Sequence, residues 1–259
     1  KKMPSEAWIP QIRASKFNKG EAYVVVNNYR QFDFTPYLYR TRDFGKTWEN
    51  LLEGKDETFG YTLSVIQDLE EPNLLFLGTE YGLYISIDEG KNWAKWTNNY
   101  PNVSTIDLAI QPREHDLIIG TFGRAAYVLD DIRPLRALAK EGAQLLNKTL
   151  HVFEPPAAFI TQNQQPTGTR FGANAIFNGE NRAKGAMITY SINNPESKKT
   201  TLKTNEKKKG AETTASKKEK PAIKYDSIIF EVFNSNNELI RTIKQKAPKE
   251  NGVHRMYWT

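Results

Sequence analysis

Short runs of β-branched and aromatic residues, separated by Gly, Asn, Asp or Pro, dominate the first half of the chain. Runs of this length with turn residues between them predict β-strands joined by hairpins. Three units follow one another, and each complete unit reads as a four-stranded meander. Their strand-like segments are IPQIRASKF, EAYVVVNN, PYLYRTRDFG and KTWENL, then YTLSVIQDL, NLLFLGTE, GLYISIDEG and NWAKW, then VSTIDLAIQ, DLIIGTFG and RAAYVLDD.

The units repeat with a nearly constant period. Gly78 recurs as Gly120 and Tyr84 recurs as Tyr127, at offsets of 42 and 43 residues. A period of ~40–45 residues with four strands is the size of one β-propeller blade. The sequence therefore predicts an all-β fold in which residues 1–133 form three propeller blades.

The third unit ends without its fourth strand. In the segment that follows, IRPLRALAKEGAQLL, Pro134 can begin a helix, and four leucines fall near one face. These leucines are Leu135, Leu138, Leu145 and Leu146. The next segment, LHVFEPPAAFI, is expected to run back over the blades as a strand or extended arm. Helix and arm together are assigned to residues 134–165.

A different pattern of strands is predicted for residues 166–259. Strand-length runs occur in FGANAIFN, KGAMITYSI, KYDSIIFEVFN, ELIRTIKQ and HRMYWT, with NSNNE (234–238) as a tight hairpin turn. About six short antiparallel strands in this length suggest a small β-sandwich of the immunoglobulin type. A lysine-rich loop, residues 195–222, is expected to be inserted between its strands.

The charge of the chain is concentrated in that loop. Residues 195–222 hold nine Lys against four Glu, which is +5 of the chain's net charge of +6. The run has almost no apolar residues to bury and no aromatic residues that could stack on bases. A solvated loop is therefore favoured over a nucleic-acid site, and no nucleic-acid partner is expected. Weak attraction to anionic surfaces is left open.

Composition excludes several kinds of chemistry. The chain has no Cys, which excludes disulfides, thiolate metal sites and a Cys nucleophile. Its histidines, His115, His151 and His254, share no metal-ligand spacing, and no Gly-rich phosphate loop precedes a helix. No metal or other cofactor is therefore expected. No apolar run is long enough to span a membrane, and the N-terminal residues lack the apolar core of a signal peptide.

Two stretches, RTRDFGKTWENL and SIDEGKNWAKW, share one spacing of residues. In each, a hydroxyl residue, an Asp, a Gly and a Trp recur at the same intervals, in a hairpin between the third and fourth strands of a unit. An Asp can accept hydrogen bonds from its own turn, and a Gly can adopt a backbone conformation that is costly for other residues. A structural turn is thus predicted for Thr41, Asp43, Gly45 and Trp48, and for Ser86, Asp88, Gly90 and Trp93.

Two functional interpretations of this motif are less favoured. A calcium loop needs six to eight oxygen ligands, and each turn offers only one or two acidic side chains followed by Lys. A glycosidase needs a second carboxylate about 5–10 Å away across a sugar. Asp residues repeated along the outer rim of successive blades would not face each other.

The motif resembles the Asp-box, or bacterial neuraminidase repeat, of sialidases, two-propeller xyloglucanases and sortilin-like receptors. The wider run from PYLYRTRDFGKTW to DLIIGTFGRAAYVLDDIRPLRAL is similar to the last blades of large bacterial sortilin-like propeller proteins, often labelled "glycosyl hydrolase". In those proteins FEPPAAF and a β-sandwich come next. The third unit departs from the pattern, because no Gly or Trp completes the box after Asp131.

This resemblance implies that the protein is secreted, periplasmic or on the cell surface. It also implies that the chain is the C-terminal part of a longer protein, whose signal and remaining blades lie upstream. Three blades cannot close a propeller, and an open fragment would expose strand edges. The expected partners are therefore further blades, from an upstream segment or another chain, together with a protein, peptide or glycan ligand.

The connection NNYRQFDFTPY, residues 27–37, is the best candidate binding site. It is longer than a hairpin needs and carries aromatic and Arg side chains that a rigid blade could present. The candidate ligand-binding residues are Tyr29, Arg30, Phe32, Asp33 and Tyr37. The alternative, that these aromatics pack against a neighbouring blade or the C-terminal arm, is equally consistent with the sequence.

Two functions are predicted from these features. The preferred one is a non-catalytic binding or scaffold protein that engages its ligand through a propeller face. The alternative is a glycoside hydrolase, sialidase- or xyloglucanase-like, whose catalytic carboxylates lie in upstream blades. The scattered arginines of the chain show no sialidase-like cluster in the sequence.

Overall fold

The computed structural model describes residues 3–55, 57–159, 182–193 and 226–259 of the chain. The fold is mostly β, with several small antiparallel sheets consistent with propeller blades, and it divides into two compact units. Unit 1 comprises residues 1–145 and 162–183, and unit 2 comprises residues 146–161 and 184–259. The predicted loop 195–222 and the predicted strand in FGANAIFN lie outside the described residues. The predicted domain boundaries stay a prediction.

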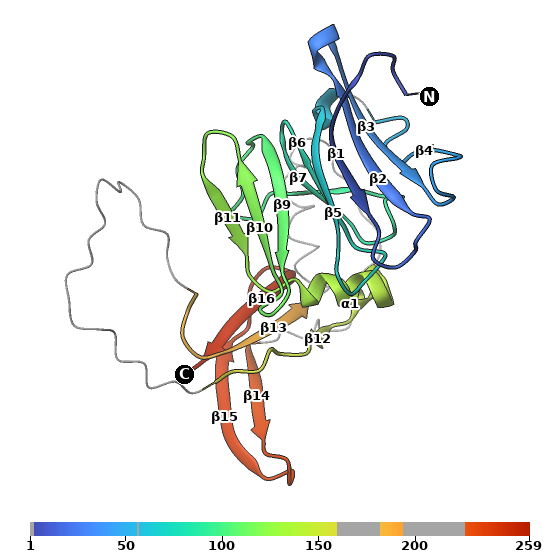
Figure 1. Cartoon of the computed structure of the whole chain (residues 1–259). Helices are drawn as coiled ribbons and strands as arrows, with labels where there is room; N and C mark the ends of the chain where they lie inside the picture. Colours follow the sequence, from blue (N-terminus) through green and yellow to red (C-terminus); the bar gives the residue numbers. More distant parts are fainter. Residues whose placement is uncertain (1–2, 56, 160–181, 194–225) are drawn as a thin grey trace, which may run out of the picture. The chain divides into compact units, whose positions relative to one another are not determined.

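Unit 1 contains three sheets, called blade 1, blade 2 and blade 3 (Figure 1). In each, strands adjacent in sequence pair antiparallel, so each sheet is a meander. Among the described residues blade 3 has three strands, where the other two have four. The strands are β1 (Trp8–Ala14), β2 (Ala22–Asn28), β3 (Asp33–Thr41) and β4 (Glu49–Asn50) in blade 1; β5 (Thr62–Gln67), β6 (Leu75–Thr79), β7 (Gly82–Ser86) and β8 (Ala94–Trp96) in blade 2; and β9 (Thr105–Gln111), β10 (Asp116–Thr121) and β11 (Ala126–Leu129) in blade 3.

The blades pack face to face through apolar side chains. Val25 and Leu38 of blade 1 share one buried cluster with Leu75 and Leu77 of blade 2. The opposite face of blade 2 forms a second cluster with blade 3. Because successive side chains of a strand point to opposite faces, blade 2 is apolar on both faces. Each such side chain contributes about 1.5–3 kcal/mol when it is fully buried.

Hydrogen bonds and a close backbone approach also connect the blades. Thr62 of blade 2 donates from Oγ1 to the carbonyl of Val26, at 2.8 Å. Ser64 Oγ donates to the carbonyl of Thr105 in blade 3, at 3.2 Å. A Cβ added to Gly78 would collide with that same hydroxyl and carbonyl. A glycine is therefore required at this position of blade 2 by the proximity of blade 3.

Helix α1 (Arg133–Glu141) follows blade 3 and belongs to unit 1. Pro134 lies in its first turn, as predicted. Ile132 and Ala139 pack into the apolar cluster between blades 2 and 3. The helix ends before Gly142, whose φ is 94°, so it is shorter than the leucine pattern predicted. Leu145 and Leu146 lie beyond it, in the 3₁₀ turn η3 (Ala143–Asn147).

Antiparallel pairing gives unit 1 two distinct ends. Trp8 at the start of β1 pairs with Asn27 near the end of β2, so the first strand begins beside the β2–β3 connection. We call this the hairpin end; it also carries the 3₁₀ turns η1 (Tyr29–Gln31) and η2 (Glu57–Phe59), near the connection to β5. The β3–β4 and β7–β8 turns lie at the other end, called the Asp-box end. In Figure 1 the hairpin end is at the top of unit 1, and α1 lies at the Asp-box end.

The described residues of unit 2 form a three-stranded and a two-stranded antiparallel sheet. Tyr190 and Ile192 of the first sheet share a buried cluster with Ile228 and Phe230 of the second. The predicted turn at 234–238 joins the two strands of that second sheet. An immunoglobulin-like sandwich stays a prediction. The strands are β12 (Leu150–Val152), β13 (Ala186–Ile192) and β16 (Gly252–Trp258), and β14 (Ser227–Phe233) and β15 (Leu239–Lys246).

Candidate functional site at the hairpin end of unit 1

Stacked aromatic rings connect blade 1 to blade 2 at the hairpin end. Tyr29, in η1, stacks on Tyr61 with ring centroids 4.6 Å apart and an interplanar angle of 23°. Tyr61 immediately precedes β5, and Phe34 at the start of β3 lies 6.4 Å from the same ring. Aromatic pairs of this kind contribute about 0.5–1.5 kcal/mol beyond the area they bury. The rings thus hold the β2–β3 connection against the entry of the next blade.

Arg30 extends this group of rings toward the start of the chain. Its guanidinium lies 4.3 Å from the ring centroid of Trp8 and 5.7 Å from that of Tyr29. Both Arg30 and Trp8 are exposed. A cation over an exposed aromatic face contributes about 0.5–1 kcal/mol. The arrangement fixes a positive charge at the surface rather than burying it.

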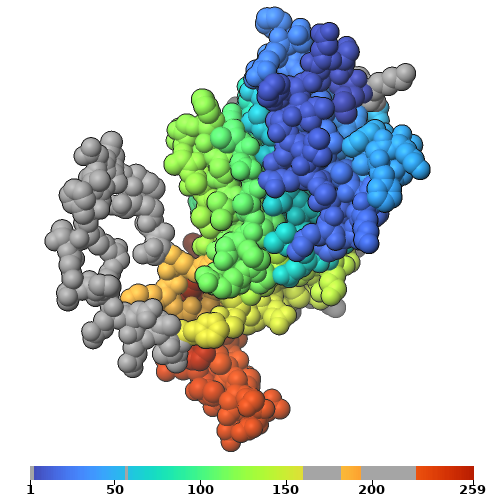
Figure 2. All heavy atoms as spheres, in the orientation of Figure 1, coloured from blue at the N-terminus to red at the C-terminus, as the bar shows by residue number. Residues whose placement is uncertain are grey.

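Phe32 ends the η1 turn and points into solvent. Its φ of 58° places it in the left-handed region, and its N–H donates to the carbonyl of Tyr29 at 3.0 Å. The side chain is 89% exposed. A left-handed backbone costs a non-glycine residue roughly 1–2 kcal/mol. The hairpin containing Phe32 projects beyond the turns of blade 3 in this view (Figures 1 and 2).

Asp33 and Tyr37, the other two candidate residues, face inward. Tyr37 is buried, and its hydroxyl donates to Asp33 Oδ2 at 2.9 Å. The backbone N–H of Thr35 donates to Asp33 Oδ1 at 3.1 Å. Burial acts to raise the pKa of Asp33, but hydrogen bonds from Thr35 and Tyr37 lower it overall. Within the 27–37 connection, Asp33 and Tyr37 thus pack inward, whereas Arg30 and Phe32 are exposed.

An unpaired carboxylate oxygen lies at the same end of blade 2. Glu80, in the β6–β7 turn, has a buried Oε2 without a hydrogen-bond partner in the described part of the chain. Burial raises the pKa of Glu80 above its usual 4.5. Burial, with a smaller contribution from the Glu80 charge, also raises the pKa of Tyr61. The hairpin end thus combines a partly buried carboxyl group with exposed rings.

These side chains form one surface, which we call the aromatic edge. It consists of Trp8, Tyr29, Arg30, Phe32, Phe34 and Tyr61. The sequence pointed to Tyr29, Arg30 and Phe32 but missed the other three. The order of strands in a meander could have predicted the positions of two of these three residues. The first strand of a blade begins at the end where the β2–β3 connection lies, so Trp8 and Tyr61 could have been placed there.

The two Asp-box turns at the opposite end have nearly the same hydrogen bonds. Asp43 Oδ1 accepts from the backbone N–H of Thr47 at 2.8 Å, and Asp88 Oδ1 accepts from that of Asn92 at 2.9 Å. In each turn the Gly N–H donates to a hydroxyl oxygen, that of Thr41 or Ser86, at 2.8 Å. Gly45 and Gly90 have φ angles of 83° and 85°.

Electrostatics support a structural role for these turns. Hydrogen bonds from the backbone N–H and hydroxyl of Thr47 lower the pKa of Asp43 to about 2. For Asp88, burial acts to raise the pKa, but bonds from Asn92 and Ser86 lower it overall. The Trp48 ring lies 3.5 Å from where a Cβ on Gly45 would be, and Trp93 Nε1 donates to the Gly90 carbonyl at 3.0 Å. Both carboxylates are thus ionised at neutral pH and engaged within their own turns.

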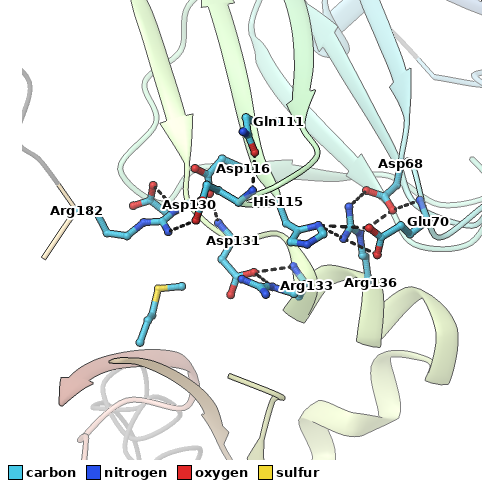
Figure 3. Close-up of polar contacts among 12 residues, drawn as sticks. Asp68, Glu70, Gln111, His115, Asp116, Asp130, Asp131, Arg133, Arg136 and Arg182 are labelled. Atoms are coloured by element: carbon cyan, nitrogen blue, oxygen red, sulfur yellow. Dashed lines mark hydrogen bonds and ion pairs between the residues drawn. The ribbon is translucent and has the colours of Figure 1, made fainter. Parts of the chain in front are cut away.

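A second polar cluster at the Asp-box end attaches α1 to the blades (Figure 3). Arg136 of α1 donates from Nε and Nη2 to the two oxygens of Asp68, at 2.7 and 2.9 Å. Its Nη1 donates to Glu70 at 2.9 Å and to His115 Nδ1 at 2.6 Å. Because a guanidinium has only donors, this His115 nitrogen accepts. Arg136 therefore connects three segments that are far apart in sequence.

The neighbouring ion pairs fix the exit of the chain from blade 3. Asp131 donates its backbone N–H to Asp116 Oδ1 at 2.9 Å and receives the Arg133 side chain. Arg182 pairs with Asp116 and Asp130, as Figure 3 also shows. Burial lowers the pKa of Arg182, but these carboxylates raise it overall. The charges of this cluster are mutually paired, and the arrangement stabilises the unusual end of the repeat.

No group of three or more His, Cys, Asp or Glu side chains in the described ranges could hold a metal ion. None of the helices in the part that the structure describes is both long and apolar enough to cross a membrane.

Comparisons with known proteins give partial matches to β-propeller proteins over about half the chain. The chain matches the GH74 enzyme of Niastella koreensis at 16% identity and a TM-score of 0.39, covering 48% of this chain and 21% of the enzyme. It matches the GH74 xyloglucanase of Xanthomonas campestris at 15% identity and a TM-score of 0.37, covering 57% and 25%. It matches a structure of YCF48 bound to D1 peptide at 18% identity and a TM-score of 0.35, covering 49% and 38%. The chain thus spans well under half the length of these proteins.

No protein-family model matches the chain, and no curated protein matches it in sequence. The site is therefore described by its own geometry.

Proposed function

We propose that the chain is part of a non-catalytic binding or scaffold protein that engages a protein, peptide or glycan at the hairpin end of its blades. The observation that carries this proposal is the aromatic edge. There, Trp8 and Tyr29 of blade 1 lie against the exposed guanidinium of Arg30, and Tyr29 stacks on Tyr61 at the entry of blade 2. Tyr, Trp and Arg are the residues that most often dominate binding energy at interfaces. Rings fixed by stacking also lose little freedom when a ligand binds.

The test is binding of the purified chain to peptide and glycan arrays, with Phe32→Ala and Tyr29→Ala as variants. Phe32 is almost fully exposed, so its loss is expected to weaken binding at least about tenfold while the melting temperature stays unchanged. Tyr29→Ala also removes the stack on Tyr61 and is expected to cost about 0.5–1.5 kcal/mol of stability.

Two other outcomes of this test would favour a different binding surface or a different function. Unchanged array binding in both variants would place the ligand on another surface. Turnover of any arrayed glycan by the complete protein, with its upstream blades, would favour the alternative, a glycoside hydrolase whose carboxylates lie in those blades.

We also infer that a further blade covers the exposed face of blade 3. Phe76 and Ile85 pair across β6 and β7 and are buried in the cluster shared with blade 3. One repeat later, Ile118 and Val128 pair across β10 and β11 in the same way, yet both are exposed. Apolar residues at these register positions are suited to contact with another sheet. The covering blade would come from an upstream segment or another chain.

Val128→Lys tests this inference. Without the covering blade, the isolated chain is expected to associate through the exposed face as its concentration rises, and the variant is expected to stay monomeric. Sedimentation velocity over a range of concentrations measures both. A wild-type chain that is monomeric and unfolds cooperatively at every concentration would contradict the inference.

A further inference from the structure

Unpaired positive charge is confined to the hairpin end among the described arginines of unit 1. Seven of these nine arginines pair with a carboxylate, and the two that do not are Arg30 and Arg124. Arg30 lies in the β2–β3 connection and Arg124 in the β10–β11 turn, so both are at the hairpin end, and both are exposed. The paired residues are Arg13, Arg40, Arg42, Arg113, Arg133, Arg136 and Arg182.

We propose that Arg30 binds a carboxylate of a peptide ligand, an Asp or Glu side chain next to an apolar residue that contacts Phe32. This proposal rests on the proposed binding function and names the class of its ligand. The guanidinium lies over the Trp8 ring, 4.3 Å from its centroid, and Tyr29 lies near it. The N–H groups of this guanidinium have no carboxylate partner among the described residues. Those groups match the two oxygens of a carboxylate.

The stacked rings also prepare Arg30 for binding. A free Arg side chain loses conformational freedom when a ligand immobilises it, and this loss weakens binding. Contacts with Trp8 and Tyr29 already restrict Arg30 before any ligand arrives. By contrast, Arg136 has its donors engaged by Asp68, Glu70 and His115. Arg30 is thus the better placed of the two to bind an anion from solution.

Phe32 supplies the apolar part of the proposed subsite. It follows Arg30 by two residues, is 89% exposed and occupies the left-handed region. An apolar ring exposed at a costly backbone position adds little to the stability of the isolated chain. Phe34, also exposed, lies nearby at the start of β3 and contacts Tyr61. A ligand with a carboxylate and a neighbouring aromatic or aliphatic side chain matches this pair of features.

The ring geometry favours a peptide over an acidic sugar. Sugars bind aromatic residues mainly by lying flat on an open ring face. One face of Trp8 carries the Arg30 guanidinium, and the facing surfaces of Tyr29 and Tyr61 contact each other. One face of each of these three rings is therefore already occupied, and the protruding Phe32 is the most exposed ring of the group. Phe32 suits contact with an apolar side chain next to the carboxylate.

The test uses the full chain and two pools of fluorescein-labelled heptapeptides with random flanking residues, acetylated and amidated at their ends. One pool carries Phe-Asp at its centre and the other Phe-Asn. Fluorescence anisotropy is expected to show at least about tenfold tighter binding of the Phe-Asp pool, which corresponds to about 1.4 kcal/mol. Arg30→Ala should abolish that preference. Arg30→Lys should retain only part of it, because it keeps the charge but loses the planar fork.

Arg113→Ala is the matched control, since Arg113 is an exposed arginine at the Asp-box end that pairs with Glu114. It is expected to bind both pools as the wild type does. Equal binding of the two pools, or a Phe-Asp preference that survives Arg30→Ala, would overturn the carboxylate subsite but not the binding function. Binding of an oligogalacturonate probe in preference to both pools would overturn it in favour of an acidic glycan. Binding of neither probe would count against the proposed function itself.

Discussion

The two ends of unit 1 hold charge in opposite ways. At the Asp-box end, Arg136 and Asp68 are buried together, with side chains 9% and 0% exposed, and further ion pairs surround them. At the hairpin end, Arg30 lies exposed over the ring of Trp8 and has no carboxylate partner among the described residues. Mutually satisfied charges add stability but have little left to offer a ligand. The difference separates the end that maintains the fold from the end that we propose binds a ligand.

The same contrast holds for the repeated aromatic residues. Trp48 and Trp93 lie against the glycines of their own turns, so their positions follow from local turn geometry. Tyr29 instead stacks on Tyr61, which belongs to the connection into the next blade. An aromatic residue that recurs at a fixed repeat position therefore marks the fold. One that occurs in a single long connection is the better candidate for function.

The largest expected effect is at the Asp-box end, from Arg136→Ala. Removing one partner of a buried ion pair leaves the other charge unpaired in a desolvated site, at a cost of about 3–5 kcal/mol. Asp68 is fully buried, so the cost is expected in this range. Urea denaturation followed by tryptophan fluorescence measures the free energy of unfolding. Arg113→Ala, at the exposed surface of the same end, is the control and should change the free energy of unfolding by less than about 0.5 kcal/mol.

A second variant makes this prediction specific to the ion pair. The double variant Arg136→Met with Asp68→Leu replaces both charges by apolar groups. Its free energy of unfolding should therefore fall by less than that of either single variant. The free energy of unfolding of Arg136→Ala could instead lie within about 0.5 kcal/mol of the wild-type value. In that case the cluster would not be stabilising α1. The contrast between the two ends would then fail.

The sequence was sufficient for features that depend on local chemistry. The blade repeat follows from alternating apolar runs, and the change from strand to helix after the third described strand of blade 3 follows from Pro134 opening α1. The Asp-box turns follow from Asp and Gly at fixed positions. The length of α1 was overestimated because Gly142, in a left-handed conformation, ends the helix before the last leucines.

Features that depend on long-range contact could not be predicted in the same way. Arg136 meets Asp68 and His115 only because three connections converge at one end of the unit. The 27–37 connection was identified as a candidate site from its composition. The sequence did not show which residues of this connection point outward and which point inward, because Tyr37 reaches the core only through the register of β3.

The smallest expected effect is at the hairpin end, from Glu80→Gln. Burial raises the pKa of Glu80 in the folded state, so the folded chain favours the protonated form more than the unfolded chain does. The associated stability is fully present below the unfolded pKa of about 4.5 and is lost as the pH rises through the folded pKa. Above that pH the folded chain carries a desolvated carboxylate, and Gln removes this charge with little change of shape.

Glu80→Gln is therefore expected to raise the melting temperature at pH 7–8 and to leave it unchanged near pH 4. Because Glu80 is partly exposed, the gain should be only a few tenths of a kcal/mol. Thermal unfolding across this pH range measures the difference, with Glu6→Gln, at an exposed position, as the control that should show none. A loss of stability at pH 7–8 would mean that the carboxylate is stabilising in the folded chain. The hairpin end would then use its charges for stability, as the Asp-box end does.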